Sequence, residues 1–238
     1  MSVATEGAAA RVEAPGFAPL GVVAFTTTRG AGSFGLHGSE PVAAVTARWD
    51  ALRAGLGPSV PRLATARQVH GVRVLTHNDS WRGWLRADEA DGHIAPARGT
   101  AIAVSVADCV PIFIAHPSGV VAILHAGWRG TAGGMMAAGV QGMLRLGLSP
   151  RDLRVYLGPG VCGDCYEVGP DVYEQITSRS AAEPTRVDLR AVLADQAASL
   201  GVGEVEWSPH CTRCDNTLFF SHRAGDEGRQ LAVIFAPI

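Results

Sequence analysis

Three short hydrophobic runs dominate the middle of the sequence, at residues 101–106, 110–115 and 120–124. Each run is rich in Val and Ile and is bounded by Gly, Pro or Asp, a pattern typical of buried β-strands. By the same criteria, further strands are expected at residues 22–27, 72–75, 153–157 and 231–235.

Helical patterns lie between these strands, at residues 40–55, 131–146, 170–178 and 189–200. Pro41 suits the first turn of the first helix, and Gly55 suits its end. Strands and helices interleave without strict alternation, which predicts an α/β fold with mixed rather than purely parallel sheets. We expect a single domain over residues 19–238. Residues 1–18 show no periodicity, and we interpret them as a flexible tail.

Composition narrows the possible functions. The formal net charge of −2 is spread along the chain, which argues against a nucleic-acid or anionic-membrane partner. All 20 basic residues are arginine. The absence of lysine excludes a phosphate-binding P-loop and Schiff-base chemistry, because both need a lysine amine. An anionic substrate would therefore be held by arginine, backbone amides or a metal.

The N-terminal sequence has neither the basic nor the apolar region of a signal peptide, and no run of about 18 apolar residues predicts a membrane span. We therefore expect a cytoplasmic protein. In that compartment the five cysteines are interpreted first as metal ligands or nucleophiles, and only second as disulfides.

Polar residues interrupt the hydrophobic runs at three places. Cys109 separates two expected strands, His125 follows a third, and His70 precedes a fourth. Two imidazoles and a thiolate are good ligands for Zn²⁺, and three protein ligands leave a fourth position open. By spacing alone the alternative stays open that these residues are an inert buried thiol and core histidines, because they match no short zinc motif.

Two other functions fit the same residues. A metal-free cysteine hydrolase would use Cys109 as nucleophile, with His125 or His70 as base. A catalytically silent partner protein would keep the zinc only for stability.

Two CxxC pairs form a separate pattern, at residues 162–165 and 211–214. Four cysteines can form a structural zinc site. However, the gap between the pairs is far longer than the roughly 15–20 residues of a zinc ribbon. We therefore interpret them as free thiols packed near each other, with a second metal site as the alternative.

Five motifs occur in the order seen in the YfiH-like family, which has long been labelled laccase-domain or multicopper polyphenol oxidase: QVHG (68–71), ADCVP (107–111), HAGWRG (125–130), YEVG (166–169) and FFSHR (219–223). The chain resembles this family from about residue 26 to residue 229. The resemblance implies an αβ sandwich with mixed sheets and a zinc site at His70, Cys109 and His125. It also implies purine nucleoside phosphorylase activity on inosine or adenosine, with adenosine deaminase activity.

Further site residues follow from this resemblance and the local pattern. Arg129, in a glycine-flanked loop before an expected helix, is the first candidate for binding phosphate or ribose, and Arg29 is the second. Asp91 resembles an acidic position of the family and is a candidate for proton transfer. Asp108, beside Cys109, is a candidate for catalysis or for orienting a histidine. Each of the four could instead be a surface, turn or cap residue.

The sequence also departs from the family pattern. Residues 29–38 are shortened, Gly35 stands where an asparagine is typical, and Arg48-Trp49 replaces an Asn-Arg pair. We expect these changes near the substrate entrance. Three aromatic residues could stack on a purine, although such residues more often belong to the core: Tyr166, Phe219 and Phe220.

Copper is the less favoured metal. A multicopper oxidase needs a three-copper cluster, typically supplied by His-x-His pairs, and the 8 histidines contain no such pair. A His₂Cys set can form a blue-copper centre only with a long axial Met or carbonyl ligand. No Met lies beside the three residues in sequence, so a Met ligand would have to come from elsewhere in the fold.

Overall fold

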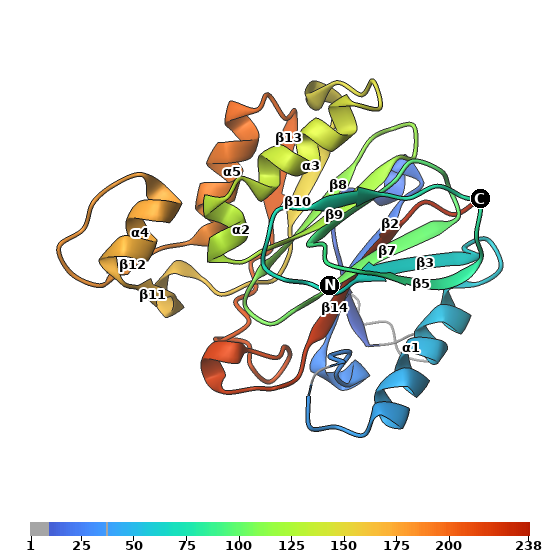
Figure 1. Ribbon diagram of the computed structural model, residues 1–238, viewed down its shortest axis with the longest axis horizontal. Coiled ribbons are helices and arrows are strands. Elements are labelled where there is room, and N and C mark those ends of the chain that lie inside the picture. The colour runs from blue at the N-terminus through green and yellow to red at the C-terminus, as the bar shows by residue number, and fades with distance from the viewer. Residues whose placement is uncertain (1–9, 37) are drawn as a thin grey trace.

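Two six-stranded β-sheets packed face to face form the centre of the molecule (Figure 1). The computed structural model describes residues 10–36 and 38–238. In spatial order, sheet A consists of β1 (Arg11–Glu13), β2 (Val23–Thr27), β14 (Gln230–Phe235), β7 (Thr100–Val106), β3 (Arg62–Ala66) and β5 (Gly83–Ala87). Sheet B consists of β13 (Glu204–Trp207), β10 (Arg154–Leu157), β8 (Val110–Ala115), β9 (Val121–Ala126), β6 (Gly92–Ala95) and β4 (Val74–Thr76). A small third sheet pairs β11 (Glu167–Val168) with β12 (Thr185–Arg186).

Helices cover the outer faces of both sheets. The helix α1 (Val42–Leu56) packs on sheet A, whereas α3 (Met135–Leu144) and α5 (Leu189–Ser199) pack on sheet B (Figure 1). The short α2 (Trp128–Ala132) precedes α3, and α4 (Pro170–Thr177) lies beside the small third sheet. None of the helices in the described residues is long and apolar enough to cross a membrane.

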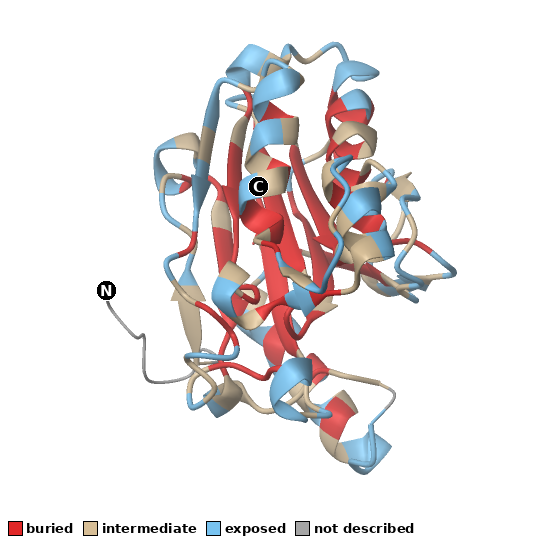
Figure 2. Ribbon diagram, turned by 90° about the vertical axis from the view of Figure 1, so that its left-hand side faces the viewer, coloured by how far each residue is buried: buried red, intermediate tan, exposed pale blue. Residues whose placement is uncertain are grey.

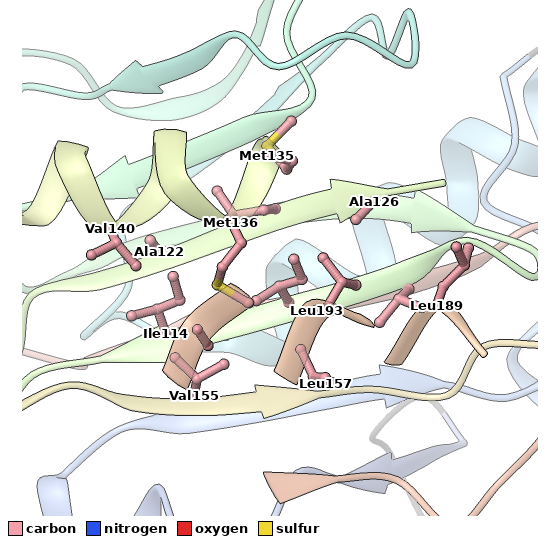
Figure 3. Close-up of a cluster of buried hydrophobic side chains, with 14 of the residues drawn as sticks. Ile114, Ala122, Ala126, Met135, Met136, Val140, Val155, Leu157, Leu189 and Leu193 are labelled. Atoms are coloured by element: carbon pink, nitrogen blue, oxygen red, sulfur yellow. The ribbon is translucent and has the colours of Figure 1, made fainter. Parts of the chain in front are cut away.

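Three hydrophobic cores hold these layers together. Between the sheets, Ile102 and Ile234 of sheet A meet Ile123 of sheet B. The other two cores lie between each sheet and its helices. Figure 3 shows the one under α3 and α5, where Met136 and Leu193 pack on strand residues such as Ile114. The central strands are buried on both faces (Figure 2), which explains why they appear in the sequence as continuous hydrophobic runs.

The sheets are mixed, as expected. In sheet A, β3 runs parallel to both β5 and β7, whereas β14 runs antiparallel to β2 and β7. The expected strands and helices are all present, with bounds shifted by one or two residues, except for the helix expected at residues 131–146. That helix is two helices, because Gly133 and Gly134 separate α2 from α3, and Gly134 has a φ of 86°.

The expectation of a flexible tail was wrong in part, and four strands were not predicted at all. Of the expected tail, residues 1–9 lie outside the described residues, but Arg11–Glu13 forms β1 and pairs with β2. Three residues are too few for a periodic pattern, so the backbone pairing at a sheet edge was not visible. The strands β3, β5, β6 and β13 were also missed, because each lacks a run of large apolar residues.

Candidate functional site

The chain crosses from sheet A to sheet B twice at the same end of the sandwich. Because β3 and β7 are parallel neighbours, both leave sheet A on the same side. Residues 67–73 then lead to β4, and residues 107–109 lead to β8. In sheet B, β9 runs antiparallel to β8, so that His125 near its end pairs with Pro111 near the start of β8. The topology therefore brings His70, Cys109 and His125 together.

The distances confirm that these three side chains converge. One potential ligand atom from each of them lies within 4.8 Å of the other two. The imidazole rings of His70 and His125 meet edge to face, with centroids 4.9 Å apart. His125 is buried, Cys109 is half-buried and His70 is exposed, so the group has a protein side and an open side.

Asp91 fixes the geometry of this group from the protein side. Its carboxylate is fully buried and accepts a hydrogen bond from Nδ1 of His125 at 2.8 Å. It also accepts the backbone amides of Val69, His70 and Gly71 at 2.8–3.1 Å. One carboxylate thus holds both the loop of His70 and the ring of His125. This leaves Nε2 of His125 to face Cys109.

Two residues at the site have an unusual backbone conformation. His70 has a φ of 59° and Asp108 a φ of 81°, both in the left-handed region that few non-glycine residues enter. Such conformations concentrate at functional sites, where the surrounding structure must hold them. Gly127 is also required, because a Cβ atom there would lie 2.7 Å from Sγ of Cys109.

Asp108 has different partners from those expected. Its carboxylate accepts the hydroxyl of Thr212 at 2.6 Å and the backbone amide of Arg223 at 2.7 Å. Among the described residues no hydrogen bond joins Asp108 to a histidine, and Asp91 occupies that position instead. Asp108 therefore ties the turn of Cys109 to the segment between β13 and β14. Proton transfer by either carboxylate stays a prediction.

A cavity of about 410 Å³ opens in front of the three side chains. Phe34, Trp49 and Leu231 form apolar parts of its wall, and Trp49 stacks on Trp84 at 4.6 Å between ring centroids. Gly35 also lines the cavity, which places the expected sequence departures at Gly35 and Trp49 beside the site.

The polar wall of the cavity contains residues that the sequence interpretation did not select: Ser105, Arg86, His222, Glu227 and Arg229. Gln68, within the first motif, is also part of this wall. Its side-chain amide bonds the backbone and hydroxyl of Ser105, which fixes its orientation. Gln68 and His222 belong to two of the motifs, but nothing in the motifs indicated that they would line a cavity. The other wall residues lie outside the motifs, on strands and loops far apart in the sequence, so no spacing pattern could reveal them.

The two arginines selected from the sequence lie elsewhere. Arg29 forms an ion pair with Asp226 at 2.6 Å and stacks on Phe220, and Arg129 is exposed and lies over the ring of Trp128. Neither belongs to the cavity wall. Arg129 lies within α2 rather than in a loop before it, because that helix begins at Trp128. Phosphate binding by Arg29 or Arg129 stays a prediction.

The three aromatic candidates are also absent from the cavity wall. Phe219 is fully buried, Phe220 packs against Arg29, and Tyr166 packs against Arg223. The aromatic residues that do line the cavity are Phe34 and Trp49.

The two CxxC pairs come together in space despite their separation in the sequence. Their sulfur atoms all lie within 4.8 Å of one another. The expectation that these four cysteines lie near each other is therefore confirmed.

Charge interactions shift the pKa values of Cys109, His125 and Asp91. Burial opposes ionisation of Cys109, but the neighbouring His125 and His70 outweigh it and lower the pKa of this thiol to about 6. Burial also opposes protonation of His125, but Cys109 and Asp91 raise its pKa to about 9. For Asp91, the hydrogen bonds from His125 and the backbone outweigh burial and lower its pKa. Without a metal, a thiolate and an imidazolium would face each other.

The donor set could hold a metal ion, and its composition is compatible with zinc. Two imidazole nitrogens and one thiolate on the protein side, with an open side toward a cavity, match a catalytic zinc site. The hydrogen bond from His125 to Asp91 matches the carboxylate–histidine support of such sites. A blue-copper centre would need a long axial ligand such as Met, Gln or a carbonyl oxygen. Within residues 10–36 and 38–238 no methionine lines the cavity, and the side-chain oxygen of Gln68 already accepts two hydrogen bonds from Ser105.

Relatives of the chain carry names from purine metabolism. A Deinococcus radiodurans protein named purine nucleoside phosphorylase is 35% identical over 235 residues, covering 90% of this chain and 88% of the relative. A protein of an unknown prokaryotic organism, named adenosine deaminase RL5, is 33% identical over 85% of this chain and 88% of its own length.

Solved structures share the fold, and a family matches nearly the whole chain. YlmD from Geobacillus stearothermophilus is 31% identical, with a TM-score of 0.86 over 94% of both chains. YfiH from Bacillus licheniformis is 27% identical, with a TM-score of 0.84 over 94% of this chain and 96% of that one. The family described as multi-copper polyphenol oxidoreductase laccase matches residues 24–237. The chain therefore belongs to this family, the YfiH-like family that its motifs resemble.

Proposed function

We propose that the chain is a zinc-dependent enzyme that cleaves inosine or adenosine with phosphate and also deaminates adenosine. The observation that carries this proposal is the convergence of His70, Cys109 and His125 at the wall of a cavity large enough for a small ligand. The names of the relatives supply the substrate class.

In this proposal the residues of the site have three roles: they hold the ion, orient a ligand and exclude water. His70, Cys109 and His125 would hold the ion, and a bound zinc ion would supply Lewis acidity toward the open side of the site. Asp91 would keep the ring of His125 in the orientation that directs Nε2 to the ion. The apolar wall with Phe34 and Trp49 would exclude water from one face of a flat purine.

An anionic co-substrate needs positive charge in the cavity. Arg86 lines the cavity and has no ion-pair partner among the described residues. Arg229 also lines it, but its guanidinium already bonds the carbonyl groups of residues 226–228. Arg86 is therefore the side chain best placed to bind phosphate.

The test of the activity is to incubate the zinc-loaded protein with inosine or adenosine, with and without phosphate, and to separate the products by chromatography. Cleavage that requires phosphate and deamination that does not would support the proposal. His70→Ala should abolish both reactions, whereas His116→Ala should not, because the imidazole of His116 hydrogen-bonds Ser118 and lies outside the cavity wall. Turnover that persists in Cys109→Ala would exclude the metal mechanism.

The phosphate assignment has its own test. Arg86→Gln should raise the KM for phosphate about tenfold or more, since a hydrogen bond to a charged group contributes about 1.5–3 kcal/mol. Phosphate-independent deamination should remain. Arg29→Gln and Arg129→Gln are measured beside it. A larger rise in KM for either of these would return the role to the arginines selected from the sequence.

A cysteine hydrolase is the second candidate. The lowered pKa of Cys109, the raised pKa of His125 and the hydrogen bond from His125 to Asp91 are the arrangement that a nucleophilic cysteine needs. Metal analysis separates the two candidates. A metal-free enzyme that iodoacetamide inactivates would favour the hydrolase. A zinc protein without nucleoside turnover would favour the silent partner role.

A further inference from the structure

Four cysteines form a second group of sulfur atoms outside the cavity, here called the four-cysteine cluster: Cys162, Cys165, Cys211 and Cys214. The first pair lies in the turn after β10, around a short 3-10 helix at Gly163–Cys165. The second pair lies in the segment between β13 and β14. An isolated bridge from Gly160 to Cys211 brings the two turns side by side.

The cluster has the dimensions of a tetrahedral metal site. A tetrahedron with Zn–S bonds of about 2.3 Å has sulfur atoms about 3.8 Å apart. The sulfur atoms of Cys165 and Cys214 are 3.5 Å apart, and all four lie within 4.8 Å of one another. Each CxxC turn supplies two of the four corners, as in structural zinc sites.

Backbone amides support a thiolate in the cluster. Sγ of Cys211 accepts the amide of Cys162 at 3.2 Å and the amide of Cys214 at 3.4 Å. Hydrogen bonds of this kind stabilise the negative charge of sulfur ligands and fix their direction. They also link the two turns to each other through a single sulfur atom.

Packing alone does not account for the cluster. Buried thiols can act as small hydrophobic residues, but only Cys211 is buried. Cys162 and Cys165 are half-buried, and Cys214 is exposed. The thiols that reach the surface would be open to oxidation unless an ion held them.

We propose that the four-cysteine cluster binds a second zinc ion, with a structural role. All four positions would be taken by protein sulfur, so this ion has no open site for a substrate. It would fasten the segment between β13 and β14, which contains 22 residues without a strand or an α-helix. That segment supplies His222, Glu227 and Arg229 to the cavity wall.

One hydrogen bond links the four-cysteine cluster to the first site, which is formed by His70, Cys109 and His125. Thr212 follows Cys211 directly and donates its hydroxyl to Asp108, the neighbour of the ligand Cys109. The second ion would therefore hold the segment in the position from which it meets the turn of Cys109.

The test counts metal ions in the full-length protein, purified without chelator and with reductant, by mass spectrometry of zinc and iron. We expect about two zinc ions per chain in the wild type and about one in Cys109→Ala. In that variant, X-ray absorption at the zinc edge should show four sulfur ligands at about 2.3 Å. Cys214→Ser should also hold about one zinc, now with a mixed nitrogen and sulfur shell. Cys214 is exposed, so this variant should still fold.

Three outcomes would overturn the second site, whereas a single zinc with four sulfur ligands in both the wild type and Cys109→Ala would support it and leave only the first site empty. One zinc in the wild type with none in Cys109→Ala would mean that the cluster binds no zinc. Iron in place of zinc would mean a different metal centre. Resistance of the four cysteines to alkylation in the denatured, metal-free protein, purified without reductant, would mean disulfides. These readouts do not depend on nucleoside turnover, so they can fail or succeed independently of the proposed activity.

Discussion

At the scale of a residue, the buried carboxylate of Asp91 positions two of the three candidate metal ligands, His70 and His125. It joins three backbone amides of the His70 loop to the ring of His125. We expect Asp91→Asn to weaken zinc binding at the first site about 10–100-fold, because an amide cannot support the imidazole in the same way. Competition with a chromogenic chelator measures this affinity. Asp88→Asn is the matched control, since Asp88 is exposed and forms an ion pair with Arg67 rather than with a candidate ligand.

The same substitution should also change how stability depends on pH. The folded state lowers the pKa of Asp91, so its stabilising effect is present above the unfolded pKa of about 3.9. It is lost as the pH falls through the lower pKa of the folded state. The difference in free energy of unfolding between the metal-free wild type and Asp91→Asn should therefore be full at pH 7 and shrink below about pH 4. Denaturant titrations at several pH values measure it, and a constant difference would contradict the assignment.

Cys109 offers a second prediction at this scale. In the metal-free protein its alkylation by iodoacetamide should reach half its maximal rate near pH 6, because the pKa of the thiol is lowered to about 6. An ordinary cysteine reaches this point near pH 8.5. Peptide mass spectrometry distinguishes Cys109 from the other four cysteines. His125→Ala should move the midpoint upward, and bound zinc should protect the thiol. The same midpoint in the metal-free wild type and in His125→Ala would show that His125 does not stabilise the thiolate of Cys109.

At the scale of an element, α2 must begin close to the sulfur of Cys109. Gly127 precedes this helix, and a Cβ atom at Gly127 would lie 2.7 Å from Sγ of Cys109. Gly127→Ala should therefore displace the thiol and reduce zinc binding at least tenfold, which the chelator competition measures. Gly55→Ala within α1 is the control, because no atom lies within 4 Å of its Cβ position. It should raise stability by up to about 1 kcal/mol and leave zinc binding unchanged.

The elements differ in how well the sequence predicts them. Buried central strands such as β8 and β9 could be predicted, because burial on both faces requires a continuous apolar run. By contrast, β6 contains His93 at a fully buried position, and β13 is a mostly exposed edge strand. Their strand conformation depends on partners distant in the sequence, so local patterns did not reveal it. The break between α2 and α3 depends on the conformation of Gly134, which the helical pattern did not indicate.

At the scale of the molecule, the site is a product of topology. The motifs identified His70, Cys109 and His125, and the sheets then explain why they meet. The cavity wall was not predictable in the same way, because Arg86 comes from β5 and Arg229 from the segment before β14. The positive charge in the cavity thus comes from elements that are distant in the sequence and become neighbours only in the folded protein. An arginine within a sequence motif, such as Arg129 in HAGWRG, need not line the cavity.

The core between the sheets should make the molecule unfold as one unit, in keeping with the single domain expected for residues 19–238. Ile123 is fully buried in this core, so Ile123→Ala should lower the free energy of unfolding by about 2–5 kcal/mol. Far-UV circular dichroism and tryptophan fluorescence should shift together, because Trp49 of α1 stacks on Trp84 of β5 on sheet A, whereas Trp128 is the first residue of α2. The exposed Val42→Ala should change stability by less than about 0.5 kcal/mol. Two separate transitions would mean that each sheet folds with its own helices, and the shared core would then contribute little to cooperativity.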